Sequence, residues 1–168
     1  FLPEGPLGVY LDLGEVRGTG EPLKGFGGVA SPVRLKTTLE RVAAVLTKAV
    51  GRKLTPIEAC LLIDEASSAV VAGNIRRSAG MRQGSEHDEE FAVAKDNLYS
   101  QDADGNWSVD PEREVLRMAN HSRVWHHKPT YQEILDSVTK QYQSGEGAIQ
   151  YAPEAIARAN ADLLSTPF

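Results

Sequence analysis

The stretch AGNIRRSAGMR, residues 72–82, marks the point where the chain is expected to change from helix to strand. An apolar run with helical spacing precedes it, and the Gly73–Asn74 pair interrupts that run. Two adjacent arginines, Arg76 and Arg77, then follow among small uncharged residues. This order predicts a buried helix, a loop that carries two guanidinium groups, and a short strand.

The two arginines allow two interpretations from the residues alone. Arginine is always charged and presents a planar fork of N–H donors that suits a phosphate, a carboxylate or a base edge. Most arginines nevertheless lie on the surface in solvent. Arg76 and Arg77 are therefore either solvated charges or donors held for an anionic ligand, and Ser78 beside them fits the second interpretation.

Two helices are expected before this stretch. Apolar residues recur at helical spacing over 33–50, and Gly51 is a natural stop. The second helix covers 55–72, where Thr55 and Glu58 have the spacing of a capping box. Because this second run is apolar nearly all round, we expect it to be buried.

The N-terminal region is expected to hold one strand and a long glycine-rich loop. Apolar and polar residues alternate over 8–13, which predicts a strand, and 14–32 contains six glycines and two prolines. Within that loop, GFGG at 25–28 permits close backbone approach to a ligand, with Lys24 beside it. It matches neither a Walker A loop nor a dinucleotide fingerprint, so a structural role and a ligand-binding role both stay open.

The remaining elements alternate between helices and strands. Patterns and turn residues predict a turn at 83–88, helices at 89–95 and 111–118, a hairpin within 96–110 and a strand at 119–125. A capping box at Thr130–Glu133 begins a helix that ends near Gly145, and a last helix starts at Pro153. The inward face of the helix after Thr130 is expected to carry Ile134, Leu135, Val138 and Tyr142. The mixed order indicates an α/β or α+β class.

The bulk composition bounds the function. The chain has 168 residues, enough for a single domain, with 41% hydrophobic residues and a net charge of -5. This mild acidity argues against direct nucleic-acid binding, which needs a basic face. One cysteine excludes an intrachain disulfide and fits a reducing compartment such as the cytoplasm, and no apolar run suits a membrane span. The terminal sequences lack the features of a start or a leader, so we expect a piece of a longer polypeptide.

Several residues with catalytic or metal-binding chemistry are better explained structurally. His126 and His127 are adjacent, which does not suit a shared metal ion on one helix face, so a metal site is disfavoured. The calcium-loop-like 102–106 segment has a misplaced glycine and is rejected. Cys60 lies within an apolar helix and is expected to be buried and inert. Glu146 is compatible with catalysis, but a turn that ends a helix accounts for it more simply.

Four motifs in register resemble the adenosylcobalamin-dependent (class II) ribonucleotide reductases. They are RGTGEPLKGFGGVAS at 17–31, VVAGNIRRSA at 70–79, LRMANHS at 116–122 and GEGAI at 145–149. The resemblance is closest to the monomeric, cyanobacterial-type enzymes. It implies an internal fragment, covering 1–168, of a ten-stranded α/β barrel, helix-rich with few strands.

The resemblance implies a function for the glycine loop and the arginine segment. In the family two specificity loops couple a bound deoxynucleotide effector to the choice of ribonucleotide substrate. The residues of this chain that would serve in them are Lys24, Gly27, Gly28, Ser31, Gly73, Asn74, Arg76, Arg77 and Ser78. An effector changes substrate choice only by binding some loop conformations better than others.

The chain also departs from the family. The radical cysteine in its Asn-x-Cys-x-Glu setting and the redox cysteines are missing, and Cys60 matches none of them. We therefore expect no catalytic residue and no metal ligand here, and an isolated chain without activity. Adenosylcobalamin, a thioredoxin-type reductant and the remaining reductase segments would serve the complete ribonucleoside triphosphate or diphosphate reductase in deoxyribonucleotide synthesis for DNA replication. The alternatives are a stand-alone, non-catalytic nucleotide-binding or interaction module, and an unrelated phosphate-binding enzyme.

Overall fold

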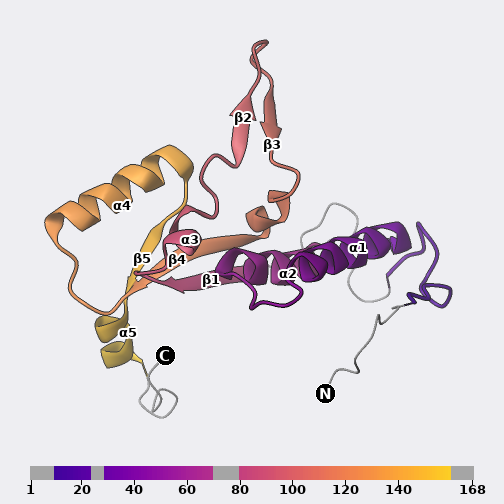
Figure 1. Cartoon of the computed structure of the whole chain (residues 1–168), viewed down its shortest axis with the longest axis horizontal. Coiled ribbons are helices and arrows are strands. Elements are labelled where there is room, and N and C mark those ends of the chain that lie inside the picture. The colour runs from indigo at the N-terminus through magenta and orange to yellow at the C-terminus, as the bar shows by residue number, and fades with distance from the viewer. Residues whose placement is uncertain (1–9, 24–28, 70–79, 160–168) are drawn as a thin grey trace.

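The computed structural model describes residues 10–23, 29–69 and 80–159, which form helices around a small parallel sheet (Figure 1). The elements in chain order are α1 (Pro32–Lys48), α2 (Pro56–Ala69), β1 (Gly80–Ser85), α3 (Glu89–Val93), β2 (Tyr99–Gln101), β3 (Trp107–Val109), the 3-10 helix η1 (Glu114–Met118), β4 (Ala119–Trp125), α4 (Tyr131–Ser144), β5 (Ala148–Tyr151) and α5 (Ala152–Arg158).

The sheet has the order β1-β4-β5, and both pairings are parallel. Arg82 of β1 lies opposite His121 of β4, and Arg123 of β4 lies opposite Ile149 of β5. Helices occupy the connections, as a parallel sheet requires. The α/β class is confirmed, whereas the described residues contain three parallel strands and one antiparallel hairpin, so the ten-stranded barrel stays a prediction.

The two long helices begin and end at the expected signals. Ser31 caps α1 directly before Pro32, and Gly51 has a φ of 83°, which a glycine adopts without strain. The capping box of α2 is present, since Thr55 Oγ1 accepts from the Glu58 N–H at 3.2 Å and Glu58 Oε2 accepts from the Thr55 N–H at 2.9 Å. α1 and α2 pack against one another.

Several expectations about elements are corrected. Residues 10–13 form no strand, and Tyr10 and Leu11 are exposed, because no described segment pairs with them. β1 extends into the expected turn at 83–88, and only 114–118 of the expected helix at 111–118 is regular. α2 is not buried all round, since Ile63 is 52% exposed. By contrast the hairpin and the strand at 119–125 are confirmed, and the helix expected at 89–95 is present over 89–93.

The core lies where α2 and α3 meet the sheet. Phe91 of α3 packs with Cys60, Ala94 and Leu116, and its ring stacks on His121 with centroids 4.9 Å apart. Buried charge also joins α2 to the sheet, because Asp64 forms an ion pair with Arg82 of β1. No helix in the described part of the chain has the length and apolar character needed to cross a bilayer.

α4 presents its apolar face outward, which overturns the expected orientation. Its capping box is confirmed, and Gly145 ends it in the left-handed region. Ile134, Leu135, Val138 and Tyr142 are nevertheless 42–91% exposed. The polar face is the one attached to the body: the Ser137 hydroxyl and the Gln141 amide both donate to the Gly147 carbonyl at 2.9 Å, and Lys140 Nζ donates to the Ala92 carbonyl. These hydrogen bonds fix the rotation of the helix about its axis.

The Phe91 ring lies directly over Gly84 of β1. A methyl group at position 84 would overlap this ring. Because Phe91 is only 5% exposed and packed on several sides, Gly84→Ala should lower the free energy of unfolding by about 1–3 kcal/mol. Urea unfolding followed by circular dichroism measures this. Phe91→Leu should lower the free energy of unfolding less in the Gly84→Ala background than in the wild type. An equal decrease in both backgrounds would contradict the overlap between the methyl group and the ring.

His121 should make the fold sensitive to acid. Burial, reinforced by the charge of Lys95, lowers the pKa of His121 to about 4, so the ring is neutral in the native state. The stability that this neutral ring confers is present above the unfolded-state pKa of about 6.5 and is lost as the pH falls toward 4. Between pH 7 and pH 5 the free energy of unfolding of the wild type should fall by about 2 kcal/mol more than that of His121→Phe, in which a phenyl ring still stacks on Phe91. Urea unfolding at each pH measures these free energies. An equal decrease in the wild type and in His121→Phe would show that His121 does not cause the acid sensitivity.

Candidate functional site

One residue of the predicted specificity loops lies within the described chain. Ser31 Oγ accepts a hydrogen bond from the Arg34 N–H at 3.4 Å and so caps α1. The other eight lie outside the described residues: Lys24, Gly27, Gly28, Gly73, Asn74, Arg76, Arg77 and Ser78. The elements that flank these segments are described. The 17–31 segment leads directly into α1, and the 70–79 segment connects the end of α2 to the start of β1.

A pocket of about 500 Å³ lies among the first turns of α1, the last turn of α2, and η1. Arg34, three residues after Ser31, and Ser68, two residues before the 70–79 segment, both line it. The full lining is Arg34, Thr37, Thr38, Arg41, Glu65, Ser68, Glu114, Val115, Arg117 and Met118. The pocket is therefore next to the described ends of both segments that sequence analysis assigns to nucleotide specificity.

The pocket is rich in guanidinium groups. Arg41 Nη1 lies 3.3 Å from Glu65 Oε1, and Arg117 Nη2 donates to Glu114 Oε1 at 2.8 Å. With Arg34, three arginines and two glutamates line the pocket. Burial raises the pKa of the Glu65 carboxyl, against the opposing effect of Arg41.

The start of α1 is a further positive feature beside the pocket. The first turn of α1 contains no acidic residue, so the positive end of the helix dipole is not neutralised there. The hydroxyl hydrogens of Thr37 and Ser68 are donated to the carbonyls of Val33 (3.1 Å) and Glu65 (2.7 Å), so these two side chains do not donate to an anion in this arrangement. Arginine forks combined with a helix N-terminus form an arrangement suited to phosphate groups.

A larger cavity, about 1140 Å³, lies between the β2–β3 hairpin and α4 but is a poorer candidate for an anion. Three cations line it, Lys95, Lys140 and Arg117, and so do three carboxylates. Each cation is already paired, with Glu146 at 2.5 Å, Asp96 at 3.0 Å and Glu114 at 2.8 Å respectively. Its charges therefore cancel locally.

Glu146 proves to be more than a turn residue. Its Oε1 accepts from Lys95 Nζ at 2.5 Å, and its Oε2 accepts from the His121 backbone N–H at 3.2 Å. Lys95 is only 8% exposed and also donates to the Ala119 carbonyl. The pair thus connects Glu146, which precedes β5, to the start of β4. It stabilises the end of the sheet where the strands begin.

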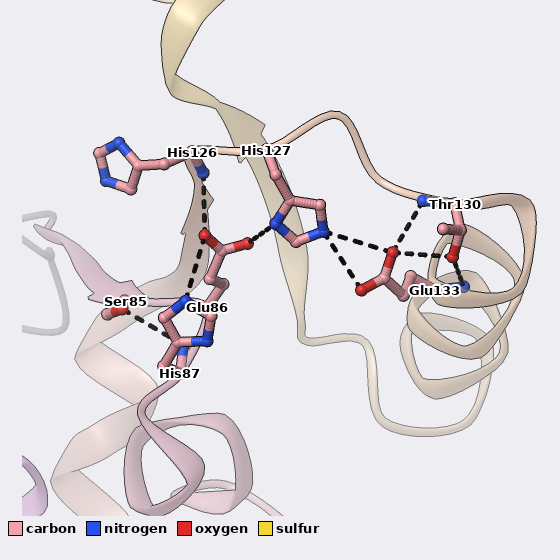
Figure 2. Close-up of polar contacts among 7 residues, drawn as sticks. All are labelled: Ser85, Glu86, His87, His126, His127, Thr130 and Glu133. Atoms are coloured by element: carbon pink, nitrogen blue, oxygen red, sulfur yellow. Dashed lines mark hydrogen bonds and ion pairs between the residues drawn. The ribbon is translucent and has the colours of Figure 1, made fainter.

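The histidine pair lies at the opposite, carboxyl edge of the sheet (Figure 2). His127 Nδ1 lies 2.7 Å from Glu86 Oε2, and its Nε2 lies 3.3 Å from Glu133 Oε1. The His126 backbone N–H donates to Glu86 Oε1 at 3.1 Å, and the His126 side chain points away from this carboxylate. The network connects the end of β1 to the start of α4.

Within the described residues no group of three His, Cys, Asp or Glu side chains has the geometry to hold a metal ion. Asp102 accepts hydrogen bonds from the backbone N–H groups of Asp104 (2.9 Å) and Asn106 (2.8 Å), so its carboxylate closes the hairpin turn. Cys60 is buried as expected, and burial raises the pKa of its thiol, which keeps it protonated.

Sequence reasoning missed Arg34, Arg41, Arg117 and Lys95. Arg34 and Arg41 are seven residues apart within the expected helix at 33–50 and therefore share one face of it. That spacing was a usable signal for a basic helix face. Lys95 gave no such signal, because its partner Glu146 comes from another element. Arg117 pairs with Glu114 within η1, but its place beside the arginines of α1 depends on the fold.

Comparisons with known proteins find relatives for part of the chain. A protein of Levilactobacillus brevis is 39% identical over 101 residues, which is 58% of this chain and 14% of the relative. Proteins of Lactobacillus leichmannii and Lactobacillus gasseri are 39% and 36% identical over 94 residues, or 55% of this chain and 13% of each relative. All three are named adenosylcobalamin-dependent ribonucleoside-triphosphate reductase.

The matched region is thus a small part of each of these reductases. No protein-family model matches the chain, and no solved structure gives a significant match. Over more than half of its length, the chain is therefore similar to ribonucleoside-triphosphate reductases that are named for their dependence on adenosylcobalamin.

Proposed function

We propose that this chain is a segment of a ribonucleotide reductase and that the pocket among α1, α2 and η1 holds the phosphates of a deoxynucleotide effector. The observation that carries the proposal is the position of this arginine-lined pocket. Its lining includes Arg34, just after the 17–31 segment, and Ser68, just before the 70–79 segment. Both segments are the ones whose motifs resemble specificity loops.

The pocket and the two loop segments would recognise different parts of the nucleotide. Arg34, Arg41 and Arg117 come from regular elements with fixed backbones, which suits binding of the phosphates common to all nucleotides. Gly73 to Ser78 would then read the effector base and bias the choice of substrate. Lys24, Gly27 and Gly28 would complete the effector site from the other segment. An effector acts in this way by favouring one loop conformation over another.

The finer features of the family belong to the same proposal. The complete enzyme would replace the 2′-hydroxyl of a ribonucleotide with hydrogen, in the cytoplasm, using adenosylcobalamin, a thioredoxin-type reductant and a radical cysteine outside this sequence. The ten-stranded barrel and the monomeric, cyanobacterial type also belong to it. The names of the relatives support a triphosphate substrate over a diphosphate.

An alternative is a non-catalytic nucleotide-binding or interaction module derived from the same fold. The same pocket would support it, so nucleotide binding alone does not separate the two. The reductase proposal requires that the chain combine with segments that carry the radical cysteine. Reductase activity that appears only when such segments and this chain are mixed would favour the reductase over the module.

Arg34→Ala should weaken effector binding. A hydrogen bond from a charged donor contributes roughly 1.5–3 kcal/mol, so its loss should raise the dissociation constant by about tenfold or more. Isothermal titration calorimetry of the chain with each of the four deoxynucleoside triphosphates measures this at one fixed salt concentration, because phosphate contacts are screened by salt.

Arg158→Ala is the matched control. Arg158 is an exposed arginine on α5 that pairs with Glu154 at 2.6 Å and is remote from the pocket lining. Its loss should leave the dissociation constant within about twofold. Equal weakening in both variants, or no heat of binding from any of the four nucleotides at millimolar concentration, would remove the pocket as the effector site.

A further inference from the structure

Glu65 places a buried carboxylate in the wall of the pocket among α1, α2 and η1. Its side chain is 6% exposed, and it lies one turn before the end of α2. Arg41 Nη1 of α1 donates to Glu65 Oε1 at 3.3 Å, and among the described residues this is the one ion pair of Glu65. The charge of Glu65 is therefore balanced by a guanidinium group that the proposed function also assigns to the phosphates.

The charged groups that face Glu65 come from both elements packed beside it. Four other charged side chains line the pocket: Arg34 and Arg41 of α1, and Glu114 and Arg117 of η1. The negative charge of Glu114 acts on the pKa of the Glu65 carboxyl in the same direction as burial, and Arg41 acts against both. Asp64, the next acidic residue along α2, is paired instead with Arg82 of β1.

The two carboxylates of the pocket would respond differently to an anion. The side chain of Glu114 is 40% exposed, so water and salt screen its charge. Glu65 is shielded from water, and its burial already disfavours the ionised form. An anion held by Arg41 brings a like charge close to Glu65 and disfavours that form further. Of the two carboxylates, Glu65 is therefore the one that takes up a proton at the lower cost.

We propose that the pocket binds its anion together with one proton from solvent, and that Glu65 holds this proton. The inference rests on the proposed function, because it concerns the same phosphate pocket. In the described arrangement Arg41 is the partner of Glu65. When phosphate oxygens take over the donors of Arg41, the carboxylate stays buried without its ion pair, and an unpaired buried charge is strongly unfavourable. Protonation of Glu65 removes that charge.

The proton also changes what Glu65 offers to the anion. A carboxylate only accepts hydrogen bonds, whereas a protonated carboxyl group has one O–H donor. A side chain that repels a phosphate thereby becomes a donor to it. Because binding of the proton and binding of the anion favour one another, the anion should bind more tightly as the pH falls.

Inorganic sulfate is the probe that tests the proposal. Sulfate stays a dianion from pH 8 to pH 6, whereas a terminal phosphate titrates near pH 6. Amide NMR shifts at residues 31–41, 65–69 and 114–118 give its dissociation constant at pH 8, 7 and 6 and constant ionic strength. For the wild type this constant should fall about three- to tenfold from pH 8 to pH 6. The lining contains no histidine, the residue whose usual pKa lies in this range.

Glu65→Gln removes the proposed proton acceptor and keeps the shape of the side chain. Its dissociation constant for sulfate should change by less than about twofold over the same pH range. Glu154→Gln is the matched control, since Glu154 is an exposed carboxylate on α5 outside the pocket lining, and this variant should keep the pH dependence of the wild type. Circular dichroism checks that each variant keeps its helices.

The carbon-13 shift of the Glu65 carboxyl group tests the proposal in the wild type and needs no variant. At pH 6.5 added sulfate should move this shift toward that of a protonated carboxyl group. Suppose sulfate binds at the pocket residues but leaves the carboxyl shift unchanged, or binds with equal pH dependence in the wild type and Glu65→Gln. Either result would overturn the proton uptake and leave the phosphate pocket standing. Absence of sulfate-induced shifts at the pocket residues would overturn both.

Discussion

The Phe91 ring lies on β1 because position 84 has no side chain, and much of the fold depends on that contact. The ring stacks on His121 and packs with Cys60 and Leu116, so one side chain joins α2, α3, η1 and β4. α3 is only five residues long and could not hold this position by its own helical stability. The contact fixes where the chain leaves β1 and where β4 begins. It also sets the position of Lys95, which follows α3 in the chain.

The described scaffold places charge at both edges of the sheet and in the pocket beside it. At the amino edge the buried Lys95 pairs with the partly exposed Glu146, and Asp64 and Arg82 join α2 to β1. Such pairs are costly to bury and stabilise mainly by fixing one geometry. The pocket among α1, α2 and η1 differs, since its arginines outnumber its carboxylates. Loops that are positioned by a rigid scaffold often carry binding residues, and two such segments end next to this pocket.

Sequence patterns predicted local structure better than they predicted contacts. The β4 strand and the α4 capping box were found from short-range signals, because the residues that specify them are close together in the chain. β5 was missed because four residues are too few for a periodic pattern. The outward face of α4 was missed because its rotation depends on Ser137 and Gln141 meeting a carbonyl in the following turn. The pocket was missed because its arginines come from two elements.

We propose that a nucleotide binds in the pocket among α1, α2 and η1. At 18.2 kDa the chain is suitable for amide-resolved NMR. On titration with deoxynucleoside triphosphates, we expect the largest shifts at residues 31–41, 65–69 and 114–118. The β2–β3 hairpin and the outer face of α4 should stay unchanged. Shifts that centre on the cavity between the hairpin and α4, or that spread evenly over the chain, would show that the nucleotide does not bind in this pocket.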